Sequence, residues 1–171
     1  MKLIPFVRIY FLLAALLLDA IDSGASVSFL ESFDMESAER WWRQMISNAD
    51  ERAIFLVARD AQGIAGTVQL HPAWAPNQRH RGEIAKMLVH RRARRRGIGA
   101  ALMEAIERRA RDSGFTLLTL DTKRGDAAEK LYERRDWIRV GVIPNYALNP
   151  DGTPCDTVVF YKDIRIGETG T

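Results

Sequence analysis

The sequence predicts one domain of the mixed α/β class, an α+β fold with helices around a mixed sheet. Two observations carry this prediction. Short apolar segments bounded by turn residues alternate with segments of helical periodicity, and the predicted strands are connected both by a tight hairpin turn and by a helical crossover. In addition, no internal repeat, low-complexity tract or linker divides the 171 residues, and a chain of this length buries a sizeable core without metal or disulfides.

The first residues raise the question of a secretory or membrane segment. An apolar stretch covers residues 10–18, but Asp19 and Asp22 stand where a signal peptide has a neutral cleavage region. The uncharged run of about ten residues is too short to span a bilayer. We therefore expect a buried amphipathic helix over residues 12–21, preceded by an atypical N-terminal extension at 1–11. A signal peptide or membrane anchor is the alternative that the pattern leaves open.

A second helix and a hairpin follow. Asp34 predicts the N-cap of the helix, and Trp42 belongs to its apolar face. Residues 53–58 and 64–70 are typical of two strands joined by a turn that contains glycine, which predicts an antiparallel hairpin. A polar loop over residues 71–82 comes next and is long enough to be functional.

The second half of the chain supplies the rest of the sheet. In order, we expect a strand at 83–89, a helix from Ile98, a strand at 117–121, a helix at 127–134 and strands at 137–143 and 157–162. The first strand, the helix and the second strand of this series form a crossover, so those two strands should be parallel.

Composition and charge exclude several classes of protein. With 47% apolar and 27% charged residues, the chain is typical of a globular protein. Its single cysteine, Cys155, permits no intramolecular disulfide, which excludes a disulfide scaffold and favours a reducing, cytoplasmic location. The formal net charge of +3 is too small for a histone-like binder of nucleic acid, although arginines cluster at 91–96 and 108–111.

The strongest functional signal lies between the strand at 83–89 and the following helix, where the sequence reads Arg94-Arg95-Arg96-Gly97-Ile98-Gly99-Ala100. The two glycines let the backbone approach a ligand closely, and the first N–H groups of a helix have no acceptor within it. With the helix dipole and the arginines, these donors predict a phosphate or pyrophosphate site. The alternative is a tight turn beside a solvated basic face. The spacing matches neither a Walker loop nor a dinucleotide-binding loop.

These residues resemble a known family. The pattern Arg94-x-x-Gly97-x-Gly99 after an apolar strand, followed further along by Ala128-Glu129-Lys130-Leu131-Tyr132-Glu133, resembles the GNAT superfamily of acetyl-CoA-dependent N-acetyltransferases over residues 12–163. The resemblance implies the acyl-CoA N-acyltransferase fold, with a central, mostly antiparallel sheet and one splayed pair of parallel strands. Residues 164–171 would then form a C-terminal tail.

Within this stretch, residues 24–29, 83–89, 120–122 and 150–152 look most like the tabtoxin resistance acetyltransferases. That resemblance implies direct transfer of an acetyl group from acetyl-CoA, without a metal, to a primary amine of a small molecule, either amino-acid-like or a toxin or antibiotic. The alternatives are a protein lysine or N-terminal acetyltransferase and a non-catalytic sensor of acetyl-CoA. We expect no nucleic-acid or membrane partner, and a homodimer remains open.

The resemblance also implies roles in binding acetyl-CoA. The backbone amides of residues 95–100, beside Arg94, would hold the pyrophosphate. The pantetheine arm would pair with the backbone of Leu88 and Val89 as an added strand does, and an N–H near Val89 would polarise the thioester carbonyl. Three arginines are candidates for a contact with the 3′-phosphate: Arg91, Arg92 and Arg124.

Three residues are candidates for catalysis. Tyr132 matches the position of a general acid for the departing thiolate, because a phenol with a pKa near 10 is protonated at neutral pH. Glu83 and Asp121 look like the two acids that face the substrate in the tabtoxin subgroup and would remove a proton from the amine, directly or through water. Glu31 is a further acid that suits a cationic acceptor. The alternatives are core packing for Tyr132, a solvated strand end for Glu83 and a turn cap for Asp121.

Two features depart from the family pattern. Gly125 stands where many members have an asparagine that touches the cofactor, and residues 1–11 do not resemble the strand that normally precedes the first helix. The three histidines lack the spacing of a metal site, and no histidine near Cys155 in sequence favours a thiol nucleophile, so we expect neither chemistry.

Overall fold

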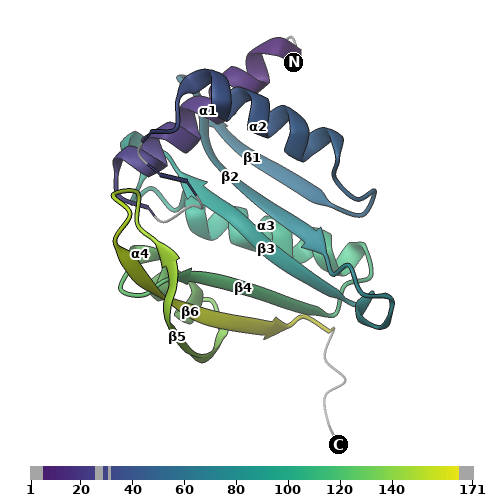
Figure 1. Cartoon of the computed structure of the whole chain (residues 1–171). Helices are drawn as coiled ribbons and strands as arrows, with labels where there is room; N and C mark the ends of the chain where they lie inside the picture. Colours follow the sequence, from purple (N-terminus) through teal and green to yellow (C-terminus); the bar gives the residue numbers. More distant parts are fainter. Residues whose placement is uncertain (1–5, 26–28, 31, 166–171) are drawn as a thin grey trace, which may run out of the picture.

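A six-stranded sheet with helices on both faces forms the centre of the computed structural model, which describes residues 6–25, 29–30 and 32–165 (Figure 1). The helices are α1 (Phe6–Asp22), α2 (Met35–Ser47), α3 (Ile98–Asp112) and α4 (Ala127–Glu133), with 3₁₀ turns η1 (Pro76–Gln78) and η2 (Arg91–Ala93). The strands are β1 (Ile54–Asp60), β2 (Gly63–Pro72), β3 (Arg81–Val89), β4 (Leu117–Lys123), β5 (Ile138–Leu148) and β6 (Pro154–Asp163).

The strand order is β1-β2-β3-β4-β6-β5. β3 and β4 are parallel and are connected through α3, whereas the other neighbouring strands are antiparallel. The predicted fold class is thereby confirmed: the sheet is mixed and mostly antiparallel, and its parallel pair is the one that the crossover predicts. The hairpin of β1 and β2 is confirmed as well.

Each face of the sheet has its own helices and its own core cluster. Leu16 and Leu17 of α1 pack with Trp42 of α2 on one face, and all three side chains are almost fully buried. Met103 and Ile106 of α3 are buried on the other face. In Figure 1, α1 and α2 lie over the β1 and β2 end of the sheet, whereas α3 lies behind it. The predicted N-cap also forms, since the Asp34 carboxylate accepts a hydrogen bond of 2.8 Å from a backbone N–H in the first turn of α2.

The first helix is longer than predicted. α1 begins at Phe6 rather than at residue 12, and Tyr10 is already part of the buried core. The pattern that begins at residue 12 is therefore the middle of a helix, and only residues 1–5 of the predicted extension lie outside the described residues. Of the helices in the described part of the chain, none combines the length and the apolar character that crossing a membrane requires.

The polar loop is shorter than predicted. β2 continues to Pro72 and β3 begins at Arg81, because the antiparallel ladder pairs His71 with Glu83. Similarly, β5 runs on to Leu148, past the predicted end at 143, in its pairing with β6. In both places pairing with a neighbouring strand outweighs the local turn signals.

Candidate active site

The loop between β3 and α3 has the backbone geometry of an anion site. Arg95 (φ 61°) and Gly97 (φ 77°) are left-handed, and they turn the chain so that α3 begins at Ile98. Gly97 is the N-cap residue and has no side chain that accepts from the first N–H groups of α3, so these donors are available to a ligand. Gly99 allows close packing instead, because a Cβ there would lie 3.2 Å from Leu131 Cδ2 on α4.

Two arginines before this loop are engaged in the fold. Arg91 donates its backbone N–H to Asp19 Oδ2 at 2.8 Å, and its guanidinium forms an ion pair with the same carboxylate. Arg92 forms an ion pair with Asp60 in the β1–β2 hairpin, and this hydrogen bond lowers the pKa of the Asp60 carboxyl. These contacts fasten the start of the loop to α1 and to the hairpin, which disfavours Arg91 and Arg92 as contacts for a 3′-phosphate.

Arg94 fastens the loop as well, although it is exposed like the next two arginines, of which Arg96 lies 3.9 Å from the Asp60 carboxylate. The Nε of Arg94 donates to the carbonyl oxygen of Val89 at 3.1 Å, and its Nη2 donates to Ser23 Oγ at 2.7 Å. Arg95 and Arg96 are exposed beside the start of α3. The predicted anion loop therefore has one arginine that holds its shape and two that add positive charge at its surface.

β3 and β4 separate soon after their parallel pairing begins. Among the described residues, the parallel ladder ends at the pair of Glu83 and Thr119. Beyond it lies a cavity of about 560 Å³, lined by residues 84–88 of β3 and 121–123 of β4. α4, the connection between α1 and α2, and the end of β5 close the remaining sides. The edge of β3 that faces β4 thus has room for an extended ligand along 84–88.

A β-bulge in β3 shapes the wall of this cavity. The register between β2 and β3 shifts by one residue between Thr67 and Gln69, so Lys86 and Met87 together oppose the single residue Val68. Lys86 adopts a φ of 47°, which is uncommon for a residue other than glycine, and it lines the cavity. Bulges occur often beside active sites, where they re-aim a side chain. Sequence reasoning missed Lys86, although a charge within an apolar strand is a signal that points to it.

Tyr132 lines the cavity from α4. The residue is 4% exposed, and its ring packs against Phe160 and Trp137, with centroid distances of 5.8 and 6.1 Å. Burial raises the pKa of the Tyr132 phenol above its usual value, and the carboxylates of Asp126 and Asp121 raise it further. The phenol is therefore protonated at neutral pH, as a proton donor must be.

Asp121 lines the same cavity from β4 and is electrostatically coupled to Lys86. Part of Asp121 is exposed, but the cavity wall shields its carboxyl group from bulk water. This desolvation raises the pKa of the Asp121 carboxyl, and the positive charge of Lys86 lowers that pKa by a smaller amount. For Lys86 the signs are reversed: burial lowers the pKa of the ammonium, and Asp121 raises it. The site thus brings together a carboxyl and an amine, and burial shifts the pKa of each toward its neutral form.

Comparison with known proteins agrees with this geometry. The profile of the Acetyltransferase (GNAT) family matches residues 18–137. The chain belongs to the Acetyltransferase (GNAT) family. It is also 32% identical over 107 residues to an uncharacterized N-acetyltransferase in the hisH-hisA intergenic region of Azospirillum brasilense. That match covers 61% of this chain, and the chain spans 62% of the length of this curated relative.

Solved structures of the family share the fold. A ribosomal-protein-alanine N-acetyltransferase from Brucella melitensis is 21% identical, with a TM-score of 0.77, over 93% of this chain and 96% of that one. An N-acetyltransferase from Staphylococcus aureus Mu50 is 17% identical, with a TM-score of 0.79, over 96% and 98%. A putative acetyltransferase from Salmonella typhimurium, solved with acetyl-CoA, is 14% identical, with a TM-score of 0.76, over 98% and 95%. At these identities the likeness concerns the fold alone.

Three of the predicted site residues of this GNAT chain line the cavity together: Leu88, Asp121 and Tyr132. Glu83 does not line it. Because Glu83 pairs with Thr119, two residues before Asp121, both acids lie on one face of the sheet, separated by about 7 Å along the strand direction. Val89 is the last residue of β3, at the entrance to the anion loop.

The segments at 71–82 and 144–156 differ in their position relative to the cavity. The segment at 71–82 contributes no residue to it, because it precedes most of β3 whereas the cavity lies along the second half of that strand. The segment at 144–156 does contribute, through Tyr146, Ala147 and Leu148. Glu31 lies outside the described residues.

Gly125 departs from the family pattern without disturbing the loop after β4. Its φ is 80°, a left-handed conformation that asparagine also tolerates, and its N–H donates to Glu129 Oε2 at 2.8 Å. Arg124 beside it pairs with Asp156 at 3.3 Å, in an exposed position. Among the described residues, no group of three or more His, Cys, Asp or Glu side chains is arranged to hold a metal ion.

Proposed function

We propose that this chain transfers the acetyl group of acetyl-CoA to a primary amine of a small molecule, as the resemblance to the tabtoxin resistance acetyltransferases implies. One observation carries the proposal: the separation of β3 and β4 creates a cavity with Asp121 on one strand and Tyr132 on the helix that follows it. A carboxyl and a protonated phenol that line one cavity can accept a proton from the amine and donate one to the leaving sulfur.

The residues present fit acetyl-CoA as the co-substrate. The free N–H groups at the start of α3, with Arg95 and Arg96 beside them, suit the pyrophosphate. The edge of β3 at Leu88 and Val89 suits the amide groups of the pantetheine arm, which pair with backbone as a strand does. The Salmonella typhimurium structure, which shares the fold, contains acetyl-CoA.

The chemistry follows from the positions of the acids. An acceptor amine is an ammonium at neutral pH, so it must lose a proton before its nitrogen attacks the thioester carbon. Asp121 lines the cavity and takes this proton directly, whereas Glu83, further along the same face, acts through water. When the C–S bond breaks, Tyr132 donates to the departing sulfur.

The walls of the cavity favour a small acceptor over a protein segment. Phe29 and Leu30 close it from the connection between α1 and α2, and Tyr146 and Leu148 close it from β5. A cavity of about 560 Å³ between these side chains suits a small amine better than a folded protein segment. The shared fold with a putative phosphinothricin N-acetyltransferase supports a small acceptor, and that with the Brucella melitensis enzyme supports the alternative, a protein N-terminus.

Calorimetric titration followed by an assay of thiol release tests the proposal. The purified chain is titrated with acetyl-CoA and with dephospho-CoA, and thiol release is then measured with free amino acids, amine antibiotics, and peptides that begin with alanine or contain lysine. We expect binding of acetyl-CoA and thiol release with one or more of the small amines. Release with peptides alone would favour the protein acetyltransferase.

Two variants separate catalysis from binding. Asp121→Asn and Tyr132→Phe keep the size of the side chain, so both should bind acetyl-CoA as the wild type does while thiol release falls. Binding without release by the wild-type chain across the whole panel would favour the non-catalytic sensor. Failure to bind acetyl-CoA would overturn the proposal, because the anion loop and the cavity would then lack their ligand.

A further inference from the structure

We propose that Lys86 is itself an acetyl acceptor, so that the chain acetylates its own Lys86 from bound acetyl-CoA when no amine substrate occupies the cavity. This inference rests on the proposed function, because it uses the same co-substrate in the same cavity. It adds a modification site and a means by which the enzyme limits its own activity.

The position of Lys86 carries the inference. The bulge in β3 places this lysine on the cavity wall, within the stretch of strand along which the pantetheine arm would lie. Asp121, the candidate base, lines the cavity from the neighbouring strand and is close enough to interact electrostatically with Lys86. An amine and a base therefore line one cavity, and the strand segment at which the thioester is expected begins at the end of that cavity.

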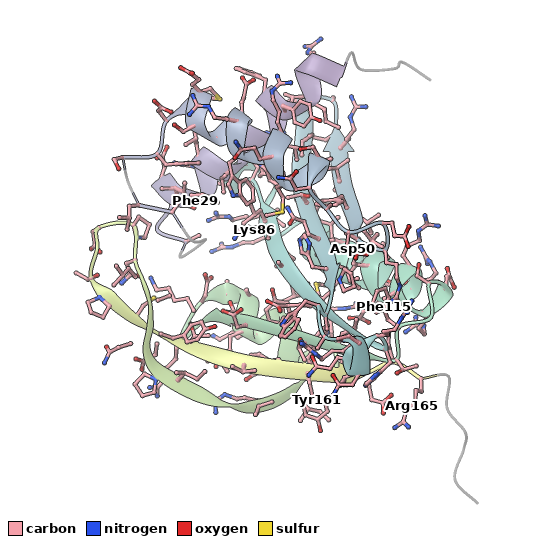
Figure 2. All side chains as sticks on the ribbon, turned by 45° about the vertical axis from the view of Figure 1, so that its right-hand side comes forward. Phe29, Asp50, Lys86, Phe115, Tyr161 and Arg165 are labelled. Atoms are coloured by element: carbon pink, nitrogen blue, oxygen red, sulfur yellow. The ribbon has the colours of Figure 1, made fainter. Side chains whose placement is uncertain are left out.

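The amine of Lys86 lies close to two aromatic rings. Its Nζ lies 5.7 Å from the ring centroid of Phe29 and 5.7 Å from that of Trp41. Figure 2 shows Phe29 and Lys86 next to each other on this side of the molecule. Phe29 also lines the cavity, so its contact with Lys86 keeps the amine close to the cavity wall. Burial there lowers the pKa of the ammonium, which increases the neutral, nucleophilic fraction.

The reaction balances without a further reactant. Lys86 loses one proton from Nζ to the Asp121 carboxylate, and the nitrogen then attacks the thioester carbon. As the C–N bond forms and the C–S bond breaks, the nitrogen loses its second proton to water, and Tyr132 donates a proton to the departing sulfur, so that one proton is released to solvent in the overall reaction. The products are N-acetyl-Lys86 and coenzyme A with a free thiol, and Tyr132 regains its proton from Asp121 or from water.

Other lysines provide internal comparisons. Lys123 also lines the cavity, at the end of β4, but the contacts with the Phe29 and Trp41 rings are made by Lys86. Lys130 is exposed on α4, away from the cavity lining, and reports chemical acetylation in solution. Lys162 donates to Glu107 Oε2 of α3 at 2.9 Å in a partly buried ion pair, away from the cavity lining, so its amine is held away from the thioester. We expect modification in the order Lys86, then Lys123 and Lys130, then Lys162.

Acetylation of Lys86 would end transfer to other amines. The amide is neutral and larger than the ammonium, so it removes the charge that lowers the pKa of Asp121 and fills part of the acceptor space. An enzyme that has acetyl-CoA but no acceptor would thus inactivate itself, whereas a bound acceptor would protect Lys86 by occupying the same space.

Site-resolved mass spectrometry tests this directly. The full chain is incubated with acetyl-CoA in the absence of any amine, digested, and the acetyl occupancy of each lysine is followed with time. We expect Lys86 to react at least roughly tenfold faster than Lys130, because the bound thioester and the amine react within one molecule. For the same reason the rate should not depend on protein concentration. Asp121→Asn should slow the reaction at Lys86 by roughly tenfold or more, whereas Lys130→Arg should leave it unchanged.

Several outcomes decide the inference separately from the proposed function. If the chain acetylates free amines while Lys86 stays unmodified, the inference is overturned and the proposed function is retained. Acetylation of Lys123 in place of Lys86 has the same meaning. Acetylation of Lys86 without transfer to any amine supports the inference and counts against a small-molecule acceptor. After incubation with acetyl-CoA alone, the wild type should lose transferase activity in proportion to occupancy, whereas Lys86→Arg should keep the activity with which it began.

Discussion

Replacing Tyr132 with phenylalanine removes one hydroxyl from the cavity and little else. The ring packs between Phe160 and Trp137, and phenylalanine keeps these contacts, so the free energy of unfolding should change by about 1 kcal/mol or less. A general acid contributes roughly 10²–10⁴-fold to a rate. Burial raises the pKa of Tyr132, which makes the phenol a weaker acid than a thiol with a pKa of about 8.5. Proton donation to the departing sulfur is therefore only weakly favourable, and we expect kcat to fall by roughly 10², the lower end of that range.

The assay is steady-state thiol release with the best amine of the panel, together with calorimetric binding of acetyl-CoA. Tyr146→Phe is the matched control, because Tyr146 lines the same cavity but is 58% exposed at the acceptor side. We expect Tyr132→Phe to bind acetyl-CoA normally and to lose kcat, and Tyr146→Phe to keep kcat. A kcat within twofold of wild type in Tyr132→Phe would refute the role of the phenol and leave only its packing.

Three further predictions follow from the same structure. Because desolvation raises the pKa of Asp121, the base loses its charge at a higher pH than an ordinary aspartate does, so the acid limb of the kcat/KM profile should lie above about pH 4. Asp121→Asn should abolish that limb. If the limb remains in this variant, it belongs to another group. Gly66→Ala would place a Cβ 2.8 Å from a backbone oxygen of β3, so it should lower the free energy of unfolding by about 1–3 kcal/mol and weaken binding of acetyl-CoA. Gly141→Ala is the control: a Cβ there meets no atom within 4 Å, so neither urea unfolding nor calorimetric binding should change. Glu107→Ala leaves the buried indole N–H of Trp137 without its acceptor and removes the carboxylate partner of Lys162, which keeps its hydrogen bond to the carbonyl oxygen of Arg135. The substitution should cost about 3–5 kcal/mol in urea unfolding, and a loss below about 1 kcal/mol would contradict this account of the ion pair.

Sequence reasoning succeeded where the physical cause is local. The N-cap at Asp34 depends on one side chain and the N–H groups of the next turn. The start of α3 depends on a left-handed glycine at Gly97. The parallel pairing of β3 and β4 follows from the connection between them, since a helix must bridge the ends of two parallel strands. Each of these features was predicted from a short stretch of residues.

Sequence reasoning failed where the cause is pairing between distant segments. Sequence analysis predicted a loop at 71–82, but both ends of this segment are strand, because β2 and β3 pair with each other as far as Pro72 and Gly82. Arg91 and Arg92 were two of three candidates for the 3′-phosphate, and their sequence neighbourhood did not reveal that Asp19 and Asp60 pair with them. No pattern within a single segment reports such partners.

The sequence by itself predicted the fold class, the glycine turn before α3 and two residues that line the cavity, Asp121 and Tyr132. Only the tertiary structure decided that β3 and β4 separate after Glu83, and that a bulge aims Lys86 into the space between them. The reason is that helix caps, turns and crossovers depend on interactions over a few residues or on chain connection. A cavity depends on how strands far apart in the sequence align, and a register shift of one residue changes which side chain faces it.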